Sequence, residues 1–132
     1  MYEEIKNDIL GEKYSLSIAL VSAKKSKEIN KKYRKIDKPT NVLSFAFSKT
    51  EGEILLCPVV IKKETKKNNR TYKEWMDFLV IHGMLHLKGM RHSSRMEQEE
   101  TKYDQKYFYR HRRGIHYDQS DSGRILKRRK KS

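Results

Sequence analysis

Residues 71–92 read TYKEWMDFLVIHGMLHLKGMRH. The stretch opens with Thr71 and Glu74, the Thr-x-x-Glu spacing of a capping box at a helix N-terminus. Apolar residues then dominate as far as Leu87. Gly89 follows, and glycine is the residue type that most readily adopts the left-handed turn after a helix. These signals predict a helix from about residue 71 to residue 88 and a sharp turn at Gly89.

Three histidines lie within this stretch. A helix would place His82 and His86 on one face, with their Cβ atoms about 5–6 Å apart, and the turn at Gly89 would bring His92 back toward them. Two histidines at this spacing are common without a metal, but three around a helix-ending glycine favour a metal site. Three nitrogen ligands and an open fourth position are typical of a catalytic zinc, although nickel and copper also accept imidazole.

Working outward, strands are predicted before this helix and helices around it. Alternating or short apolar runs predict strands at residues 15–21, 41–47 and 54–57, and Glu51-Gly52 is expected to form a turn. Further helices are predicted at residues 2–10, from a Ser22 cap to about Lys35, from Pro58 onward, and from a Ser94 capping box to about His111. This order indicates an α+β (α/β-type) domain with a small mixed sheet and four to five helices.

The charge balance favours a polyanionic partner. The chain has 31 Lys and Arg against 17 Asp and Glu, a net charge of +14, and residues 101–132 alone hold 11 basic and three acidic groups. Residues 113–132 are predicted to be a basic, flexible tail. Two lysine-rich clusters and one aromatic run are candidates for RNA binding or, alternatively, for solvated helix faces and core packing. They are Lys31, Lys32, Arg34, Lys35 and Lys38; Lys62, Lys63, Lys66, Lys67 and Arg70; and Tyr107, Phe108 and Tyr109 beside Arg110, Arg112 and Arg113.

Composition excludes other classes of protein. The single cysteine, Cys57, excludes a disulfide-stapled secreted fold, and a buried, inert thiol is expected. The N-terminal residues lack the pattern of a signal peptide, and no apolar run is long enough to cross a bilayer. A cytoplasmic protein without a membrane partner is therefore expected.

The histidine spacing also occurs in a class of zinc peptidases with the motif H-E-x-x-H-x-x-G-x-x-H. In that motif the glutamate beside the first histidine is the general base. Gly83 occupies this position here and has no side chain that accepts a proton. A metallopeptidase is therefore the weaker alternative, unless a carboxylate reaches the metal from elsewhere in the fold.

Three stretches together resemble the YbeY family of bacterial rRNA-maturation endoribonucleases. They are HGMLHLKGMRH at residues 82–92, INKKYRKIDKPTNVLSF at residues 29–45, and the weaker Gly52-Glu53-Ile54. The resemblance implies a catalytic domain over residues 1–112, with a single zinc ion on His82, His86 and His92. It also implies catalytic roles for these histidines and for Arg34, which matches a functional arginine of the family.

The implied activity is metal-dependent cleavage of single-stranded RNA in rRNA maturation, including processing of the 16S rRNA 3′ end, and in ribosome quality control. Partners would be rRNA precursors and ribosomal subunit proteins, and the oligomeric state is left open. Either a zinc-bound hydroxide or the RNA 2′-OH would be the nucleophile. A non-catalytic, zinc-containing RNA-binding assembly factor is the main alternative.

The same resemblance singles out further residues. Thr40, Asn41 and Ser44 match a stretch that lines the family's cleft, although turn and strand roles explain them equally well. Arg91 stands where the family usually has aspartate, so a carboxylate that would steady a histidine or a water is missing at this position. Arg91 is itself a weaker candidate for a phosphate contact.

Overall fold

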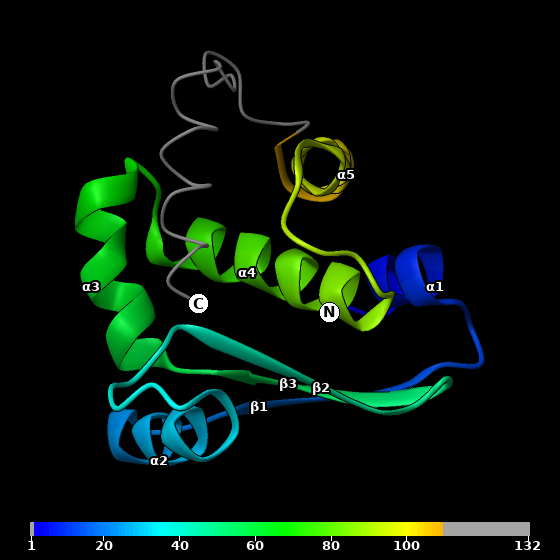
Figure 1. The fold of residues 1–132 in the computed structure, drawn as a ribbon. Coiled ribbons are helices and arrows are strands. Elements are labelled where there is room, and N and C mark those ends of the chain that lie inside the picture. The colour runs from blue at the N-terminus through cyan, green and yellow to red at the C-terminus, as the bar shows by residue number, and fades with distance from the viewer. Residues whose placement is uncertain (1, 110–132) are drawn as a thin grey trace.

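A computed structural model describes residues 2–109 of the 132-residue chain. In this part, five α-helices surround a three-stranded sheet, and a π-helical turn follows the last helix (Figure 1). The predicted α+β class with a small mixed sheet is confirmed, whereas the predicted tail at residues 113–132 lies outside the described residues. In chain order the elements are α1 (Glu3–Leu10), β1 (Ser15–Leu20), α2 (Ala23–Arg34), β2 (Val42–Ser48), β3 (Glu51–Leu56), α3 (Pro58–Asn68), α4 (Tyr72–Leu87), α5 (Ser94–Asp104) and η1 (Gln105–Tyr109).

The sheet has the strand order β1-β3-β2, with β1 parallel and β2 antiparallel to the central strand β3. Ile54 of β3 pairs with Ile18 on one side and with Ser44 on the other. Among the described strands, β2 therefore forms one edge of the sheet. Figure 1 shows α4 and α2 on opposite sides of this sheet.

The prediction of a turn at Glu51-Gly52 is wrong, because both residues belong to β3. The turn is formed by residues 49–50, between the end of β2 at Ser48 and the start of β3 at Glu51. At Gly52 a Cβ atom would collide with the Tyr14 hydroxyl and would lie 3.0 Å from both Leu87 Cδ2 and the Phe45 carbonyl oxygen. Glycine is required here because neighbouring atoms leave no space for a side chain on the strand, and not because the backbone turns.

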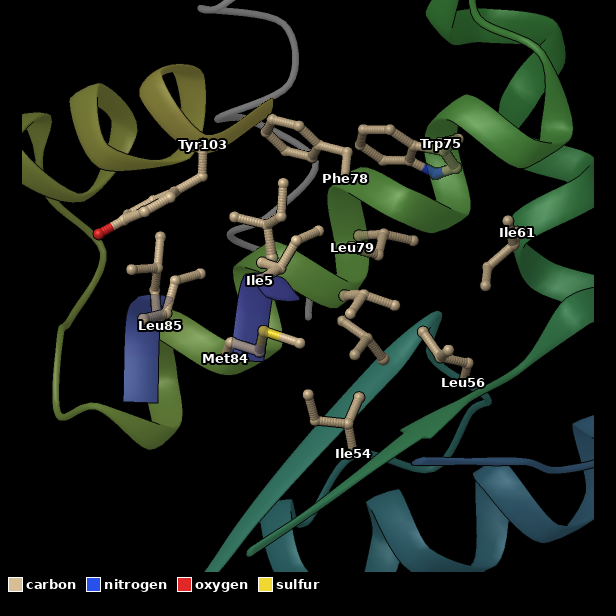
Figure 2. Close-up of a cluster of buried hydrophobic side chains, with 14 of the residues drawn as sticks. Ile5, Ile54, Leu56, Ile61, Trp75, Phe78, Leu79, Met84, Leu85 and Tyr103 are labelled. Carbon is tan, nitrogen blue, oxygen red and sulfur yellow. The ribbon is translucent and has the colours of Figure 1, made fainter. Parts of the chain in front are cut away.

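Helix α4 is the centre of the hydrophobic core. Eleven of its 16 residues are buried, so it is covered on nearly all sides. Trp75 stacks on Phe78 with ring centroids 5.5 Å apart, and the same cluster of buried side chains includes Ile54 and Leu56 of the sheet (Figure 2). Fully burying one large apolar side chain contributes about 1.5–3 kcal/mol, so this helix is fixed firmly in the fold.

The ends of the helices follow the sequence signals closely. The capping box at Thr71 is present: the Thr71 hydroxyl accepts a hydrogen bond from the Glu74 amide, and the Glu74 carboxylate accepts one from the Thr71 amide. Ser22 caps α2, and Pro58 is the first residue of α3. The capping box predicted at Ser94 is wrong by one residue. Ser93 is the cap, because its extended backbone lets its Oγ accept a hydrogen bond from the Met96 amide at 3.2 Å.

One residue of the second predicted basic cluster is not at the surface. Arg70 is 9% exposed and pairs with the buried carboxylate of Asp104 on α5 at 3.3 Å. Its guanidinium also lies over the Phe78 ring, 4.6 Å from the centroid. Including Arg70 among the candidate phosphate contacts is therefore wrong, because the side chain ties α5 to the core.

The aromatic run after α5 packs inward. Tyr107 and Phe108 are half-buried against the core, and the Tyr107 hydroxyl donates to Asp8 on α1 at 2.6 Å. Core packing, the alternative to RNA stacking, therefore describes these two residues. The arginines predicted beside them lie outside the described residues, and none of the helices within residues 2–109 has the length and apolar character needed to span a bilayer.

Candidate metal centre

The three predicted histidines converge at the C-terminal end of α4. Their ligand nitrogens all lie within 4.8 Å of one another. His82 is buried, His86 is half-buried and His92 is exposed. The convergence depends on Gly89, whose φ of 106° is in the left-handed region, so the chain reverses there and returns His92 to the helix.

The partners of the two helical histidines determine which ring nitrogens carry protons. Nδ1 of His82 lies 2.6 Å from Oε2 of Glu100, and Nδ1 of His86 lies 3.0 Å from the carbonyl oxygen of Met90. Both oxygens are acceptors, which favours the Nδ1–H tautomer in each neutral imidazole. The two Nε2 atoms then carry lone pairs, and they face each other at a distance of 3.1 Å.

Two nitrogen lone pairs that face each other at this distance repel, and a cation bound between them would relieve the repulsion. In a tetrahedral zinc site with Zn–N bonds of about 2.0–2.1 Å, neighbouring ligand nitrogens are about 3.3–3.4 Å apart. The His92 ring is close enough to complete the set, with its centroid 5.2 Å from that of His82 and 4.8 Å from that of His86. The donor set therefore fits a metal ion that prefers nitrogen ligands.

Glu100 is a site residue that the sequence motifs did not reveal. Both Glu100 and His82 are 1% exposed, so the hydrogen bond between them is enclosed by protein. A carboxylate behind a ligating histidine fixes the ring and raises its basicity. A signal for it exists in the sequence: Glu100 lies four residues after Met96, on the buried face of a helix whose other face is charged.

The absence of a side chain at residue 83 allows α4 to lie close to the sheet. A Cβ atom there would be 3.0 Å from both Ile54 Cδ1 and Ser44 Oγ. The Ser44 hydroxyl also donates a hydrogen bond to the Gly83 carbonyl oxygen at 3.2 Å. In the zinc peptidases this position carries the glutamate that acts as general base. Here Ser44 of β2 and Ile54 of β3 lie where the side chain of such a residue would begin.

A cavity of about 440 Å³ opens beside the histidines along β2. Its lining includes His82, His86 and Arg34, the last residue of α2. No carboxylate among residues 2–109 pairs with the half-buried Arg34, and burial lowers the pKa of its guanidinium below the ordinary value. Arginine has so high an ordinary pKa that the group stays charged at neutral pH. The structure thus places an unneutralised cation in the same cavity as the histidine pair.

The other residues predicted to line the cleft divide into two groups. Ser44 lines the cavity, but Thr40 and Asn41 are buried and hold the chain in place. The Thr40 backbone exchanges hydrogen bonds with the Ser26 hydroxyl, and the Asn41 side chain donates to Glu64 at 2.9 Å. Arg91 is exposed beside His92.

Comparisons with known proteins place the chain in a family. The profile of the family described as Endoribonuclease YbeY matches residues 1–112. Curated relatives named Endoribonuclease YbeY include one from Francisella philomiragia, 38% identical over 64% of this chain and 61% of its own length. Another, from Colwellia psychrerythraea, is 42% identical over 66% of this chain and 61% of its own length. This chain therefore spans about three fifths of the length of those two relatives.

A third relative and a solved structure come from Thermotoga maritima. The relative, also named Endoribonuclease YbeY, is 34% identical over 76% of this chain and 72% of its own length. The structure is the solution structure of TM1509, which is similar with a TM-score of 0.59 and 28% identity, covering 88% of this chain and 87% of that one. The match to the family profile runs through every element described here and through all three histidines, so the chain belongs to the YbeY family.

Proposed function

We propose that this protein is a zinc-dependent endoribonuclease that cleaves single-stranded RNA, with His82, His86 and His92 as the metal ligands and Arg34 as a catalytic residue. One observation carries the proposal: Arg34, His82 and His86 line one cavity, and the Nε2 atoms of the two histidines lie 3.1 Å apart. The name Endoribonuclease YbeY, which the curated relatives bear, supports the same activity. A zinc ion at these ligands supplies Lewis-acid polarisation of a phosphoryl oxygen and lowers the pKa of a water molecule.

Arg34 is suited to binding the scissile phosphate. Its planar guanidinium can donate two parallel hydrogen bonds to phosphate oxygens, and low solvent exposure strengthens that interaction. During phosphodiester cleavage the phosphoryl oxygens gain negative charge, which a fixed cation stabilises. Arg34 has no carboxylate partner among residues 2–109, so a phosphate would not compete with an internal ion pair.

The surrounding charge and the family support a ribosomal substrate. A net charge of +14 favours a polyanion such as rRNA, and the relatives' name specifies an RNA-cleaving enzyme. We assign the protein to maturation of rRNA precursors, including the 16S rRNA 3′ end, and to ribosome quality control in the cytoplasm. Ribosomal subunit proteins are its proposed protein partners. Residues 1–112 are the proposed catalytic domain and residues 113–132 a basic arm.

A peptidase function is disfavoured by two contacts. A side chain at the position beside His82 would crowd β2 and β3, because its Cβ atom would lie 3.0 Å from both Ile54 Cδ1 and Ser44 Oγ. Glu100 is the carboxylate bound to the histidine pair, but it contacts Nδ1 of His82, on the opposite side of the ring from Nε2. Glu100 is thus placed to orient a ligand and not to deprotonate a water at the metal.

The test compares the untagged wild-type protein with His86→Ala on a single-stranded rRNA precursor and on a fully paired duplex. We expect the zinc-loaded wild type to cut the single strand and spare the duplex, and His86→Ala to lose both the metal, by elemental analysis, and the cleavage. RNA binding without cleavage by the zinc-replete wild type would instead identify a non-catalytic assembly factor. If the purified protein contained nickel or copper in place of zinc, the proposed identity of the metal would be wrong, but the proposed RNA cleavage would stand.

A further inference from the structure

A second cavity neighbours the metal site along the other face of the sheet. Its volume is about 750 Å³, and it lies between α2 and strands β2 and β3. It shares Tyr33, Ser44 and Phe45 with the cavity that the histidine pair lines, so the two are neighbours on β2. A polymer whose reacting phosphate sits at the histidines would therefore have its neighbouring residues at this groove.

Aromatic rings in this groove are left open to solvent. Tyr33 is 59% exposed and Phe47 is 62% exposed, and both line the groove. The Tyr33 ring is held edge-on against Phe45, with centroids 5.2 Å apart. Phe45 and Phe47 both line the groove from β2, where the pairing with β3 shifts register between Ala46 and Ser48. Exposed aromatics on a sheet surface are a means by which proteins stack unpaired bases.

The charges around the groove favour bases over phosphates in its interior. Lys25 and Lys32 on α2 line the groove together with Glu28 and Glu53, so the four charges cancel. Glu53 of β3 accepts a hydrogen bond from the Ser17 hydroxyl of the neighbouring strand β1 at 3.4 Å. A phosphate placed there would meet a carboxylate, whereas an uncharged base can stack and donate its amino hydrogens. Lys25 lines the groove and the Lys32 ammonium lies 5.3 Å from the centroid of the Tyr33 ring, so both cations are within reach of phosphates that link bases stacked there.

We propose that this groove binds the unpaired bases that flank the scissile phosphate, with Tyr33 and Phe47 as stacking surfaces. The inference rests on the proposed endoribonuclease function and names the part of the substrate that the groove recognises. Every base has an aromatic face, so the groove selects single strands without selecting a sequence. Paired bases are already stacked in a duplex and cannot enter it.

The experiment measures binding of the zinc-loaded full chain to two fluorescein-labelled 2′-O-methyl oligonucleotides of eight units, one of adenosine and one abasic. Tyr33→Leu and Phe47→Leu are each expected to weaken binding of the adenosine strand about tenfold and to leave abasic binding unchanged. A 2-aminopurine reporter is expected to be quenched by the wild type and not by these variants. Tyr33→Phe keeps the ring and should restore affinity, and Tyr72→Leu, an exposed tyrosine at the start of α4, is the matched control.

Equal affinity of the wild-type protein for the adenosine and abasic strands would overturn the inference. Wild-type affinity for the adenosine strand in both Tyr33→Leu and Phe47→Leu would also overturn it. The latter result is expected if the groove binds a protein segment and not RNA. Cleavage of natural RNA is followed on the same preparations. Cleavage without base-dependent binding overturns the groove's role alone. Base-dependent binding without cleavage supports the groove and overturns the enzymatic function.

Discussion

His82 and Glu100 form a buried hydrogen bond, with Nδ1 and Oε2 2.6 Å apart and both side chains 1% exposed. Helices α4 and α5 are thereby joined directly behind the candidate metal. Helix α5 follows the turn that carries His92. The contact from Glu100 on α5 therefore makes the orientation of the His82 ring depend on how α5 packs. The family profile matches across both helices.

Replacing Glu100 by alanine should weaken zinc binding by about 10–100-fold, because His82 loses the acceptor that orients its ring. Glu100→Gln keeps a hydrogen-bond acceptor and should lose less. Zinc affinity is measured by competition with a chromophoric chelator, and circular dichroism monitors the fold. Glu99→Gln is the control, since Glu99 is half-buried on the same helix and makes only a 3.9 Å ion pair with Lys102. Equal effects at the two positions would contradict the orienting role.

Replacing Gly83 by glutamate should lower the free energy of unfolding by about 1–3 kcal/mol or more, because the added side chain is forced against Ile54 and Ser44. Gly83→Ala should cost less, because a methyl group adds far less volume at this contact than the glutamate side chain, and a gain of about 1 kcal/mol in helix propensity offsets part of its crowding. Urea denaturation measures both. A glutamate variant as stable as wild type would show that β2 and β3 yield easily at this contact.

Arg34→Ala should lower kcat for single-stranded RNA by about 100-fold, because the phosphoryl oxygens lose a preorganised cation in the transition state. Bound zinc should stay stoichiometric, since Arg34 is not a ligand. Arg34→Lys should recover only part of the rate, because an ammonium group cannot form the paired hydrogen bonds of a guanidinium. Lys38→Ala, an exposed cation just beyond α2, should retain the wild-type rate. A full rate in Arg34→Ala would remove Arg34 from the catalytic residues.

The exposed face of α3 should contribute salt-dependent affinity for RNA. Lys62, Lys63, Lys66 and Lys67 are exposed there. The only carboxylate of the helix, Glu64, turns inward to accept hydrogen bonds from the Trp75 indole and from Asn41, each at 2.9 Å. This face is therefore purely cationic.

Changing the four lysines to glutamine should make the slope of log affinity against log salt concentration shallower by about 0.7 for each phosphate that these lysines neutralise in the wild type. The slope is measured by titrating RNA at several salt concentrations. Arg70→Gln is the contrasting variant: it should lower stability, through the loss of the Asp104 pair, and leave the slope unchanged. An unchanged slope in the fourfold variant would mean that RNA does not bind to α3.

Deleting residues 115–132 should weaken the salt-sensitive part of RNA binding, most clearly at low salt, more than it lowers turnover at saturating RNA. This segment follows the matched residues 1–112 and includes the basic run KRRKK at residues 127–131. Basic segments add affinity for phosphates without taking part in chemistry. A deletion that lowers kcat while sparing affinity would assign these residues to the active site.

Local signals make the helix, its turn and the histidines predictable. Thr71, Gly89 and the spacing of His82 and His86 act within one helix and its ends, so their roles can be read without knowing the rest of the fold. Arg34 is identified through a family resemblance, and its position beside the histidines depends on how α2 meets β2.

The features that escape prediction arise from contacts between distant segments. Nothing near Gly52 in the chain reveals that Tyr14 and Leu87 close over it, so its sequence context indicates a turn. Arg70 belongs to a lysine-rich stretch, and only Asp104, 34 residues away, explains its burial. Glu100 escapes prediction for the same reason, because its partner lies on another helix.

The difference between the anchored His82 and His86 and the exposed His92 has a kinetic consequence for an ion bound by all three. Two ligands belong to a helix that cannot shift without disturbing the core, while the third follows Gly89 at the surface. Release of such an ion would begin with detachment of the exposed His92, while His82 and His86 would still hold it. The residence time of a bound metal would therefore depend on the surface turn that carries His92.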